Sequence, residues 1–337
     1  MTRKTFMRNM AFGAAAAAFP GFAAPQPAKT DEIRAILLHL GSNMWSKYST
    51  KLRTDEAIWR KATDYLRAKG MNMVLIDVGE GVVYPSHPEI AAEDAWSPEK
   101  LKAELARLRG MGLEPIPKLN FSATHDAWLK DYQRMVSTKK YYQVCQDVIA
   151  DLAEIFGHPR FFHLGYDEET ANHQSGQEYV VVRRGELWWH DFLWFIKTTE
   201  NAGMRPWIWS DYGWHHPEFI SRCPKSVLQS NWYYDEDGEG FDLSTVKKPY
   251  LKLYLELDKA GFDQIPGGSN WASSYWRNKG HATNKTSIGG LVKFCREHIR
   301  PEFRKGFLMG SWVQCETEKD YSAIEEGIDL FAAALNQ

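Results

Sequence analysis

The sequence is poor in cysteine, and its charges nearly balance. Its 337 residues include four cysteines, none of them in a Cys-x-x-Cys pair, at Cys145, Cys223, Cys295 and Cys315. A structural zinc site needs closely spaced thiolate or imidazole ligands, and a disulfide framework needs denser cysteine, so we expect neither. The formal net charge of -2 provides no basic surface for nucleic acid or for an anionic membrane.

Charged residues are also absent from an alanine-rich stretch between Met10 and Ala24. The preceding segment Thr2-Arg3-Lys4-Thr5-Phe6-Met7-Arg8 resembles a twin-arginine export signal with Lys in place of the second Arg. The stretch is short for a membrane span and ends in the small residues that a cleavage site needs. We predict that residues 1–28 form an export signal and that the protein is periplasmic or extracellular, without stable membrane insertion. A membrane anchor is the alternative.

The remaining chain has an ordinary core composition and many aromatic residues. Hydrophobic residues make up 44% and charged residues 25%, as in a soluble globular protein. Residues 29–337 could hold two domains, but α/β barrels of this length form one domain, and no linker interrupts the sequence. The 14 Trp and 15 Tyr fit a carbohydrate site, since flat rings stack on the apolar faces of sugars. Most of the Trp residues should still lie in the core.

Short apolar segments alternate with helical patterns along this part of the chain. Eight segments have the length and composition of strands: 35–41, 73–78, 114–121, 160–167, 205–211, 226–233, 263–270 and 307–313. Periodicity or capping residues indicate helices at 55–69, 97–109, 141–156, 187–201, 286–298 and 319–335. Strands that alternate with helices predict a parallel sheet, and eight such units predict a single (β/α)8 TIM barrel of the α/β class.

Polar and aromatic side chains are concentrated where the predicted strands end. In a barrel of this kind the C-terminal ends of the strands surround the active site. The residues at these ends are His39, Asp77, Glu80, Lys118, Asn120, Asp211, Asn231, Tyr234 and Glu316, together with Trp209, Trp232, Trp271 and Trp312. Any one of them could be a structural hydrogen bond at the rim, but nearly every strand ends in this way. We therefore expect these side chains, and His163 on the fourth strand, to contact a substrate.

The segment that ends the fourth strand carries two adjacent carboxylates. Because side chains alternate along a strand, His163, Gly165 and Asp167 should face the barrel interior. Glu168 comes where the strand gives way to a loop, so it can reach the same pocket. Two carboxylates in a poorly hydrated site separate their pKa values, so that one holds a proton while the other stays ionised. Glycosidic cleavage uses this division of roles, although an acidic loop without a function would look the same.

The run His163-Leu164-Gly165-Tyr166-Asp167-Glu168 resembles the His-x-Gly-Gly-Asp-Glu signature of family 20 glycoside hydrolases, the β-N-acetylhexosaminidases. The runs Trp207-Ile208-Trp209-Ser210-Asp211 and Trp312-x-x-x-Glu316 are similar to the ends of the family's fifth and eighth strands. The resemblance implies an exo-acting hydrolase of glycans that needs no metal and no cofactor. It also implies a (β/α)8 barrel.

The same resemblance implies roles for individual residues. Glu168 would be the general acid, and Asp167 would orient the 2-acetamido group of the substrate. The acetamido oxygen would attack the anomeric carbon, giving an oxazolinium intermediate and net retention, which is an exception to the scheme with two enzyme carboxylates. One tyrosine would donate to the acetamido oxygen, with Tyr233, Tyr234 and Tyr275 as candidates. The sugar pocket would be walled by Trp209, Trp232, Trp271 and Trp312, with Glu316 on the sugar hydroxyls.

The sequence departs from the family signature at two places. Tyr166 stands where the signature has its second Gly, and we expect it to fill space near the sugar. The family's arginine after the first strand is missing, because the run there is His39-Leu40-Gly41-Ser42-Asn43. That arginine binds sugar hydroxyls in the family, so these changes indicate a divergent branch with its own sugar preference.

Three other functions remain open on the same residues. A retaining glycosidase with a protein nucleophile would use Asp211 or Glu316 opposite Glu168, with the carboxyl groups about 5 to 5.5 Å apart. A sugar-binding barrel without turnover would keep the aromatic walls but not the placement of Glu168. A metal-dependent hydrolase would need the distant histidines His39, His125 and His163 to converge, and the sequence has no His-x-His or His-Glu-x-x-His motif.

Overall fold

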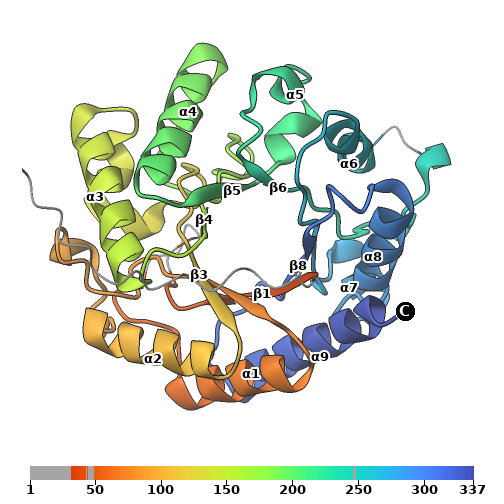
Figure 1. Cartoon of the computed structure of the whole chain (residues 1–337), viewed down its shortest axis with the longest axis horizontal. Coiled ribbons are helices and arrows are strands. Elements are labelled where there is room, and N and C mark those ends of the chain that lie inside the picture. The colour runs from red at the N-terminus through yellow and green to blue at the C-terminus, as the bar shows by residue number, and fades with distance from the viewer. Residues whose placement is uncertain (1–31, 43, 45–48, 246–247) are drawn as a thin grey trace, which may run out of the picture. The chain divides into compact units, whose positions relative to one another are not determined.

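The computed structural model describes residues 32–42, 44, 49–245 and 248–337, and the predicted export signal lies outside them. Its centre is a sheet of eight parallel strands in the order β6-β5-β4-β3-β2-β1-β8-β7. The strands are β1 (Ile33–His39), β2 (Met73–Asp77), β3 (Glu114–Lys118), β4 (Phe161–His163), β5 (Arg205–Trp209), β6 (Leu228–Ser230), β7 (Gly267–Gly268) and β8 (Gly306–Gly310). Parallel bridges from Gln229 to Gln264 and from Trp232 to Gly267 close the sheet into a barrel (Figure 1).

Helices surround this barrel, as Figure 1 shows. The α-helices are α1 (Glu56–Ala68), α2 (Pro98–Gly110), α3 (Lys139–Ile155), α4 (Gly185–Asn201), α5 (Phe219–Arg222), α6 (Pro249–Lys259), α7 (Ser274–Asn278), α8 (Ser287–His298) and α9 (Glu318–Leu335). Four of them begin at a residue whose side chain accepts from free backbone N–H groups, namely Asp55, Ser97, Thr138 and Thr317. The prediction of a single (β/α)8 barrel is confirmed.

The apolar side chains form two layers with the sheet between them. Along β1, Ala35 and Leu37 face the barrel interior, whereas Ile36 and Leu38 pack between the strands and the helices. This follows from the alternation of side chains along a strand. The interior layer also contains Trp209 at the end of β5, so the apolar filling of the barrel continues as far as the rim where the strands end.

The strands end earlier than the sequence predicts. β4 stops at His163, and β7 comprises two residues. At β4 the cause is the backbone, because φ is +67° at Gly165, +75° at Tyr166 and +55° at Glu168, values outside the region that strands occupy. Several residues that the sequence assigns to strand ends therefore lie in the loops that follow them.

Some further features concern the helices and the thiols. The helices α5, α6 and α7 lie where the sequence analysis predicts no element. None of the helices within the described ranges is both long and apolar enough to cross a membrane. Cys145, Cys223, Cys295 and Cys315 are all buried and free. This state agrees with the expectation that the protein has no disulfide framework.

Candidate active site

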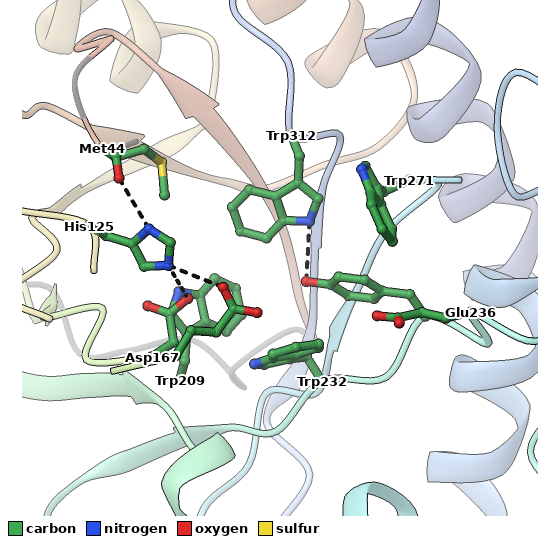
Figure 2. A pocket seen from close by; sticks show the side chains of 10 residues that line it. Met44, His125, Asp167, Trp209, Trp232, Glu236, Trp271 and Trp312 are labelled. Carbon is green, nitrogen blue, oxygen red and sulfur yellow. Dashed lines mark hydrogen bonds and ion pairs between the residues drawn. The ribbon is translucent and has the colours of Figure 1, made fainter. Parts of the chain in front are cut away.

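A pocket of about 240 Å³ lies at the C-terminal ends of the strands, and we call it the first pocket. It is lined by Met44, His125, Asp167, Glu168, Trp209, Trp232, Tyr234, Glu236, Trp271 and Trp312 (Figure 2). The three Trp residues expected to converge from the ends of the fifth, sixth and eighth strands all contribute to this lining. Acidic and aromatic side chains are interspersed in this lining, because Trp209 lies beside Asp167 and Glu236 lies on the side of Trp271 (Figure 2).

The aromatic wall is held together by ring contacts and one hydrogen bond. The Trp312 Nε1–H donates to the Tyr234 hydroxyl oxygen at 3.2 Å, and the ring centroids of Trp232 and Tyr234 lie 5.0 Å apart at 29°. Trp209 is 2% exposed and Trp271 is 36% exposed. The wall therefore runs from a buried ring to an exposed ring at the entrance, as a site for a sugar face would require.

Asp167 is fixed by the end of the neighbouring strand. The Asn120 side-chain amide donates to Asp167 Oδ1 at 2.7 Å. The amide oxygen of Asn120 in turn accepts the backbone N–H of Ser122 and of Tyr166, both at 3.1 Å. Gly165 makes this approach possible, because a Cβ there would lie 2.3 Å from the Asn120 side chain. Asn120, which the sequence analysis expects to contact substrate, thus positions Asp167 and is not part of the lining of the first pocket.

Glu168 lies between two histidines. His125 Nε2 is 3.2 Å from Glu168 Oε2 and 3.6 Å from Asp167 Oδ2, and His125 Nδ1 is 3.1 Å from the Met44 carbonyl oxygen. His173 Nε2 is 3.4 Å from the other oxygen of Glu168, Oε1. The carboxylate thus faces a separate imidazole on each side.

In this cluster of His125, Asp167 and Glu168, the imidazole holds the proton. Burial would lower the pKa of His125, but the charge of Asp167 and the hydrogen bond with Glu168 raise that pKa to about 9. Burial would raise the pKa of Glu168, but the hydrogen bond and charge of His125, together with His173, bring it below its ordinary value. His125 is therefore protonated at neutral pH, and Glu168 is ionised.

Asp211 holds the backbone of Glu168 in place. The Glu168 N–H donates to Asp211 Oδ2 at 2.8 Å, which fixes the positive φ of Glu168. Burial and then the charge of Asp167 raise the pKa of Asp211 well above its ordinary value. Asp211 does not belong to the lining of the first pocket. It lines a neighbouring hollow that also includes Glu168.

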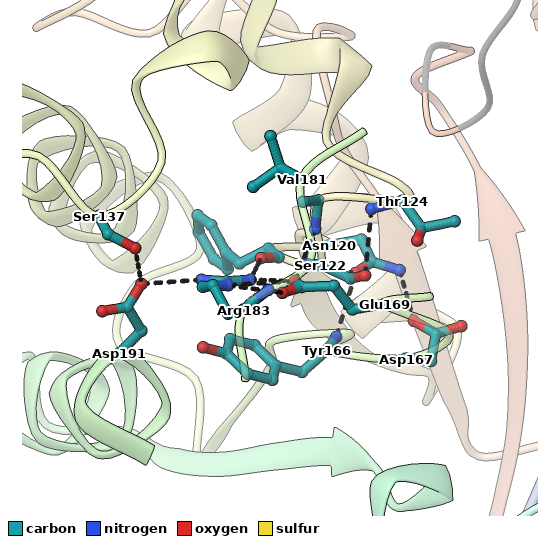
Figure 3. A network of polar contacts seen from close by, with 12 residues as sticks. Asn120, Ser122, Thr124, Ser137, Tyr166, Asp167, Glu169, Val181, Arg183 and Asp191 are labelled. Atoms are coloured by element: carbon teal, nitrogen blue, oxygen red, sulfur yellow. Dashed lines mark hydrogen bonds and ion pairs between the residues drawn. The ribbon is translucent and has the colours of Figure 1, made fainter. Parts of the chain in front are cut away.

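The next acidic residue, Glu169, points into a separate buried network (Figure 3). Arg183 Nε lies 2.9 Å from Glu169 Oε1, and the Ala123 N–H donates to Glu169 Oε2 at 2.9 Å. Arg183 Nη1 also reaches Asp191 Oδ2 at 3.2 Å. Arg183 and Asp191 are 3% and 0% exposed, so this network anchors the loop between β4 and α4.

Four predicted contact residues are buried inside the barrel and do not line the first pocket. Lys118 Nζ lies 2.6 Å from Asp77 Oδ2, and His39 Nδ1 lies 3.4 Å from the same oxygen. Burial would raise the pKa of Asp77, but Lys118 and His39 hold it well below its usual range. The His163 ring lies 4.7 Å from that of Trp209, and burial with the charge of Lys118 lowers the pKa of His163. These residues lie inside the barrel, and His163 packs against Trp209 of the first pocket.

Three more expected contacts have other partners. Glu80 accepts the Ser42 N–H at 2.6 Å, and Asn231 accepts the indole N–H of Trp214 at 2.8 Å. Glu316 is paired with Arg53 Nη2 at 2.7 Å. None of the three lines the first pocket.

The tyrosine that departs from the family signature is also displaced from the pocket. The Tyr166 ring packs against Trp188, Phe192 and Phe195, with centroids 5.4 to 5.7 Å away. This side chain is 3% exposed and lies in the layer between barrel and helices. Tyr166 therefore does not line the first pocket, although it lines a neighbouring hollow that also includes Glu168.

Among the described residues of the first pocket, the sequence analysis misses Met44 and Glu236, and it considers His125 only as a possible metal ligand. His125 follows the third strand by a short loop, so the rule that strand ends build the site could have found it. Glu236 comes two residues after Tyr234, and burial followed by the charge of Glu168 raises the pKa of Glu236. Nothing in its local sequence distinguishes it from the acidic residues that follow.

One set of side chains in the described ranges could hold a metal ion. His125, Asp167 and Glu168 place one ligand atom each within 4.8 Å of one another. A histidine must be deprotonated to bind a metal, whereas the raised pKa of His125 keeps its proton on at neutral pH. Binding of a cation by these three residues would therefore release the proton of His125.

Solved structures share this fold, although no protein-family model and no curated protein matches the sequence. The β-N-acetylhexosaminidase of Bacteroides fragilis aligns with a TM-score of 0.59 and 14% identity, over 88% of this chain and 65% of that chain. Pneumococcal StrH aligns with a TM-score of 0.57 and 14% identity, over 90% and 84% of the two chains. Dispersin B aligns with a TM-score of 0.56 and 17% identity, over 91% and 99%. The likeness establishes the barrel fold.

Proposed function

We propose that the protein is an exo-acting, retaining glycoside hydrolase of the β-N-acetylhexosaminidase kind, with Glu168 as general acid and a glycan as substrate. The observation that carries this proposal is the placement of Asp167 and Glu168 beside His125 in a pocket with four indole rings. The rings suit a sugar face, and the carboxylates can transfer a proton and orient a polar substituent. The fold shared with β-N-acetylhexosaminidases supports the same function.

The proton for the leaving group starts on His125. A bound sugar excludes water, which raises the cost of keeping Glu168 charged and therefore raises its pKa. The proton then passes from His125 Nε2 to Glu168 Oε2 across their 3.2 Å contact, and from Glu168 to the glycosidic oxygen as the bond to the anomeric carbon breaks. In the second half of the reaction Glu168 takes a proton from the attacking water. At the end of the cycle, His125 and Glu168 together hold one proton, as they did at the start.

Asp167 and Tyr234 are suited to hold the 2-acetamido group. Asn120 occupies Asp167 Oδ1, and the remaining oxygen can accept the acetamido N–H. The Tyr234 hydroxyl oxygen accepts from Trp312, which leaves its hydrogen free for the acetamido oxygen. Of the three candidate tyrosines, Tyr234 is the one in the first pocket. These bonds would align the acetamido oxygen with the anomeric carbon and offset the charge of the oxazolinium ring.

The same contacts disfavour a protein nucleophile. Asp211 is bound by the Glu168 N–H, and its raised pKa makes it a weak nucleophile. Glu316 is paired with Arg53 and is not part of the pocket lining. Attack by the substrate's own acetamido oxygen requires neither residue. A sugar-binding barrel without turnover would have no need of a general acid that shares a proton with a histidine.

A panel of chromogenic glycosides with and without a 2-acetamido group tests the proposal. We expect turnover of the N-acetyl sugars, inhibition by a thiazoline mimic of the oxazolinium ion, and no effect of a chelator. Asp167→Asn should reduce kcat far more than it raises KM, while Asp237→Asn, beside the pocket and paired with Lys248, should change neither. Equal turnover of plain glucosides together with indifference to the thiazoline would refute substrate assistance.

We also propose that residues 1–28 are an export signal ahead of a catalytic domain at 29–337. The support is the arginine-containing start followed by an uncharged, alanine-rich stretch. Expression of the full chain with and without Arg3→Lys, followed by cell fractionation and N-terminal sequencing, tests this. Cleavage near residue 28 that depends on Arg3 is the expected result, whereas an uncleaved chain in the membrane fraction would favour an anchor.

A further inference from the structure

Tyr234 and Glu236 reach the first pocket from either side of a residue with an unusual backbone conformation. Asp235, which lies between them, has a φ of +49°. Such a conformation is uncommon for a residue with a side chain, and it persists only where neighbouring contacts hold it. One of these contacts is local, because Asp235 Oδ1 accepts the Gly240 N–H at 2.6 Å. Others come from the loop between β7 and α8.

Two side chains of that loop donate to the backbone carbonyl oxygens around Asp235. The Asn284 amide donates to the carbonyl oxygen of Tyr234 at 2.7 Å and to that of Asp235 at 3.3 Å. The Trp276 Nε1–H donates to the carbonyl oxygen of Asp235 at 2.7 Å. These two carbonyls belong to the peptide planes on either side of the Asp235 Cα. The positive φ of Asp235 is therefore held by donors from a different loop.

Asn284 is fully buried and uses both ends of its amide. Its Oδ1 accepts the backbone N–H of Thr286 and of Ser287, both at 3.1 Å, at the start of α8. Its own backbone N–H donates to the carbonyl oxygen of Asn270 at 2.8 Å. Because the oxygen end is anchored on the helix, the nitrogen end has one direction, toward the carbonyl of Tyr234.

We propose that Asn284 is a positioning residue for the reaction, and that it acts through Tyr234 by fixing where the phenol hydroxyl meets the 2-acetamido oxygen. This inference rests on the proposed function. Without the amide donor, Asp235 can relax to a negative φ, and the Tyr234 ring then moves relative to Trp312, from which its hydroxyl accepts at 3.2 Å. A donor stabilises developing charge only where it is held in place beforehand.

Asn284→Asp tests this inference, because the change removes the donor and keeps the acceptor. At pH 8 the two helix N–H groups favour the ionised carboxylate, which cannot donate to the carbonyl of Tyr234. On a nitrophenyl N-acetylhexosaminide, kcat should fall roughly tenfold with little change in KM, a part of the loss expected when such a donor is removed altogether. The inhibition constant of the thiazoline mimic should rise by the same factor.

Asn72→Asp is the matched control for this variant. The Asn72 side chain accepts the Arg34 N–H at 2.8 Å and donates to the carbonyl oxygen of Glu32 at 3.0 Å. The same change therefore removes the same kind of donor, but at the N-terminal ends of β1 and β2, away from the first pocket. It should leave kcat and the inhibition constant of the thiazoline unchanged.

A double-mutant cycle separates positioning of Tyr234 from a general loss of stability. Tyr234→Phe alone should lower kcat roughly 10²-fold. In that background Asn284→Asp should change kcat by less than about twofold, because the hydroxyl on which Asn284 acts is already absent. If Asn284→Asp has a lowered melting temperature, Trp276→Phe enters the same cycle. It removes one donor to the Asp235 carbonyl and should lower kcat about threefold.

The outcomes separate this inference from the function on which it rests. A loss of kcat that disappears in the Tyr234→Phe background supports both. An equal loss in the two backgrounds, or an unchanged kcat in Asn284→Asp, refutes the positioning role while the proposed function stands. If the wild type does not hydrolyse N-acetyl glycosides, or if Tyr234→Phe retains the wild-type kcat, the proposed function fails and takes this inference with it.

Discussion

Glu168 and Glu169 are adjacent in the sequence, yet they belong to different parts of the molecule. Glu168 lies in the first pocket against His125, whose pKa of about 9 allows it to give up a proton. Glu169 is buried against Arg183, whose guanidinium keeps its charge at every pH at which the protein is folded. A carboxylate with a partner that can lose its proton is suited to catalysis. A carboxylate with a permanent cation is suited to holding the loop in place.

The largest expected effect is on kcat, which should fall when Glu168 is replaced but not when Glu169 is replaced. Glu168→Gln should lower kcat by roughly 10²- to 10⁴-fold on a substrate with a poor leaving group, because an amide cannot act as the general acid. Glu169→Gln should retain kcat within the same order of magnitude per folded molecule. Steady-state kinetics on both variants checks this, with the fraction of folded protein measured by circular dichroism. Residual activity of Glu168→Gln above about one-tenth of wild type would contradict the assignment.

The second effect is on the free energy of unfolding, which should depend on the buried partner of Glu169. Arg183→Met leaves Glu169 and Asp191 buried without their cation and should lower the free energy of unfolding by about 3–5 kcal/mol. Arg134→Met removes an exposed pair with Glu178 and should cost no more than about 1 kcal/mol. Urea unfolding of both variants measures the difference. Equal losses would mean that the Arg183 network does not anchor the loop.

The smallest effect concerns the proton on His125. The imidazole should titrate by NMR with a pKa of about 9, and Glu168→Gln should lower that value while Glu169→Gln leaves it unchanged. The pKa of His125 is higher in the folded chain than in the unfolded chain. Its contribution to stability is therefore complete below about pH 6.5 and is lost as the pH rises through about 9. A value near 6.5 in the wild type would remove the proton source from the proposed mechanism.

The sequence predicts the barrel well because its pattern is local and repeated. The helices α1, α2, α8 and α9 match their predicted ranges within about two residues, since capping residues such as Asp55 and Thr317 mark where a helix starts. The four indole rings of the first pocket also follow from the strand-end rule. The alternation of side chains along a strand does not predict the direction of a side chain in the loop that follows.

The less predictable part of the site depends on long-range contacts. His39 and Lys118 sit at strand ends, but they turn inward and pair with Asp77. His125 enters the pocket through a loop whose shape depends on Glu169 accepting the Ala123 N–H. Such pairings join residues that are 38 to 46 positions apart, so no local pattern encodes them.

The four buried thiols give the protein an internal reporter of unfolding. Burial raises the pKa of Cys223 and of Cys315 to about 12, and that of Cys145 and Cys295 well above the ordinary value. Because the thiolate is the form that reacts, alkylating reagents will modify these positions only when the barrel opens. The rate at which a reagent alkylates them therefore measures how often the barrel opens. A cysteine introduced on the surface would be alkylated well before any of them.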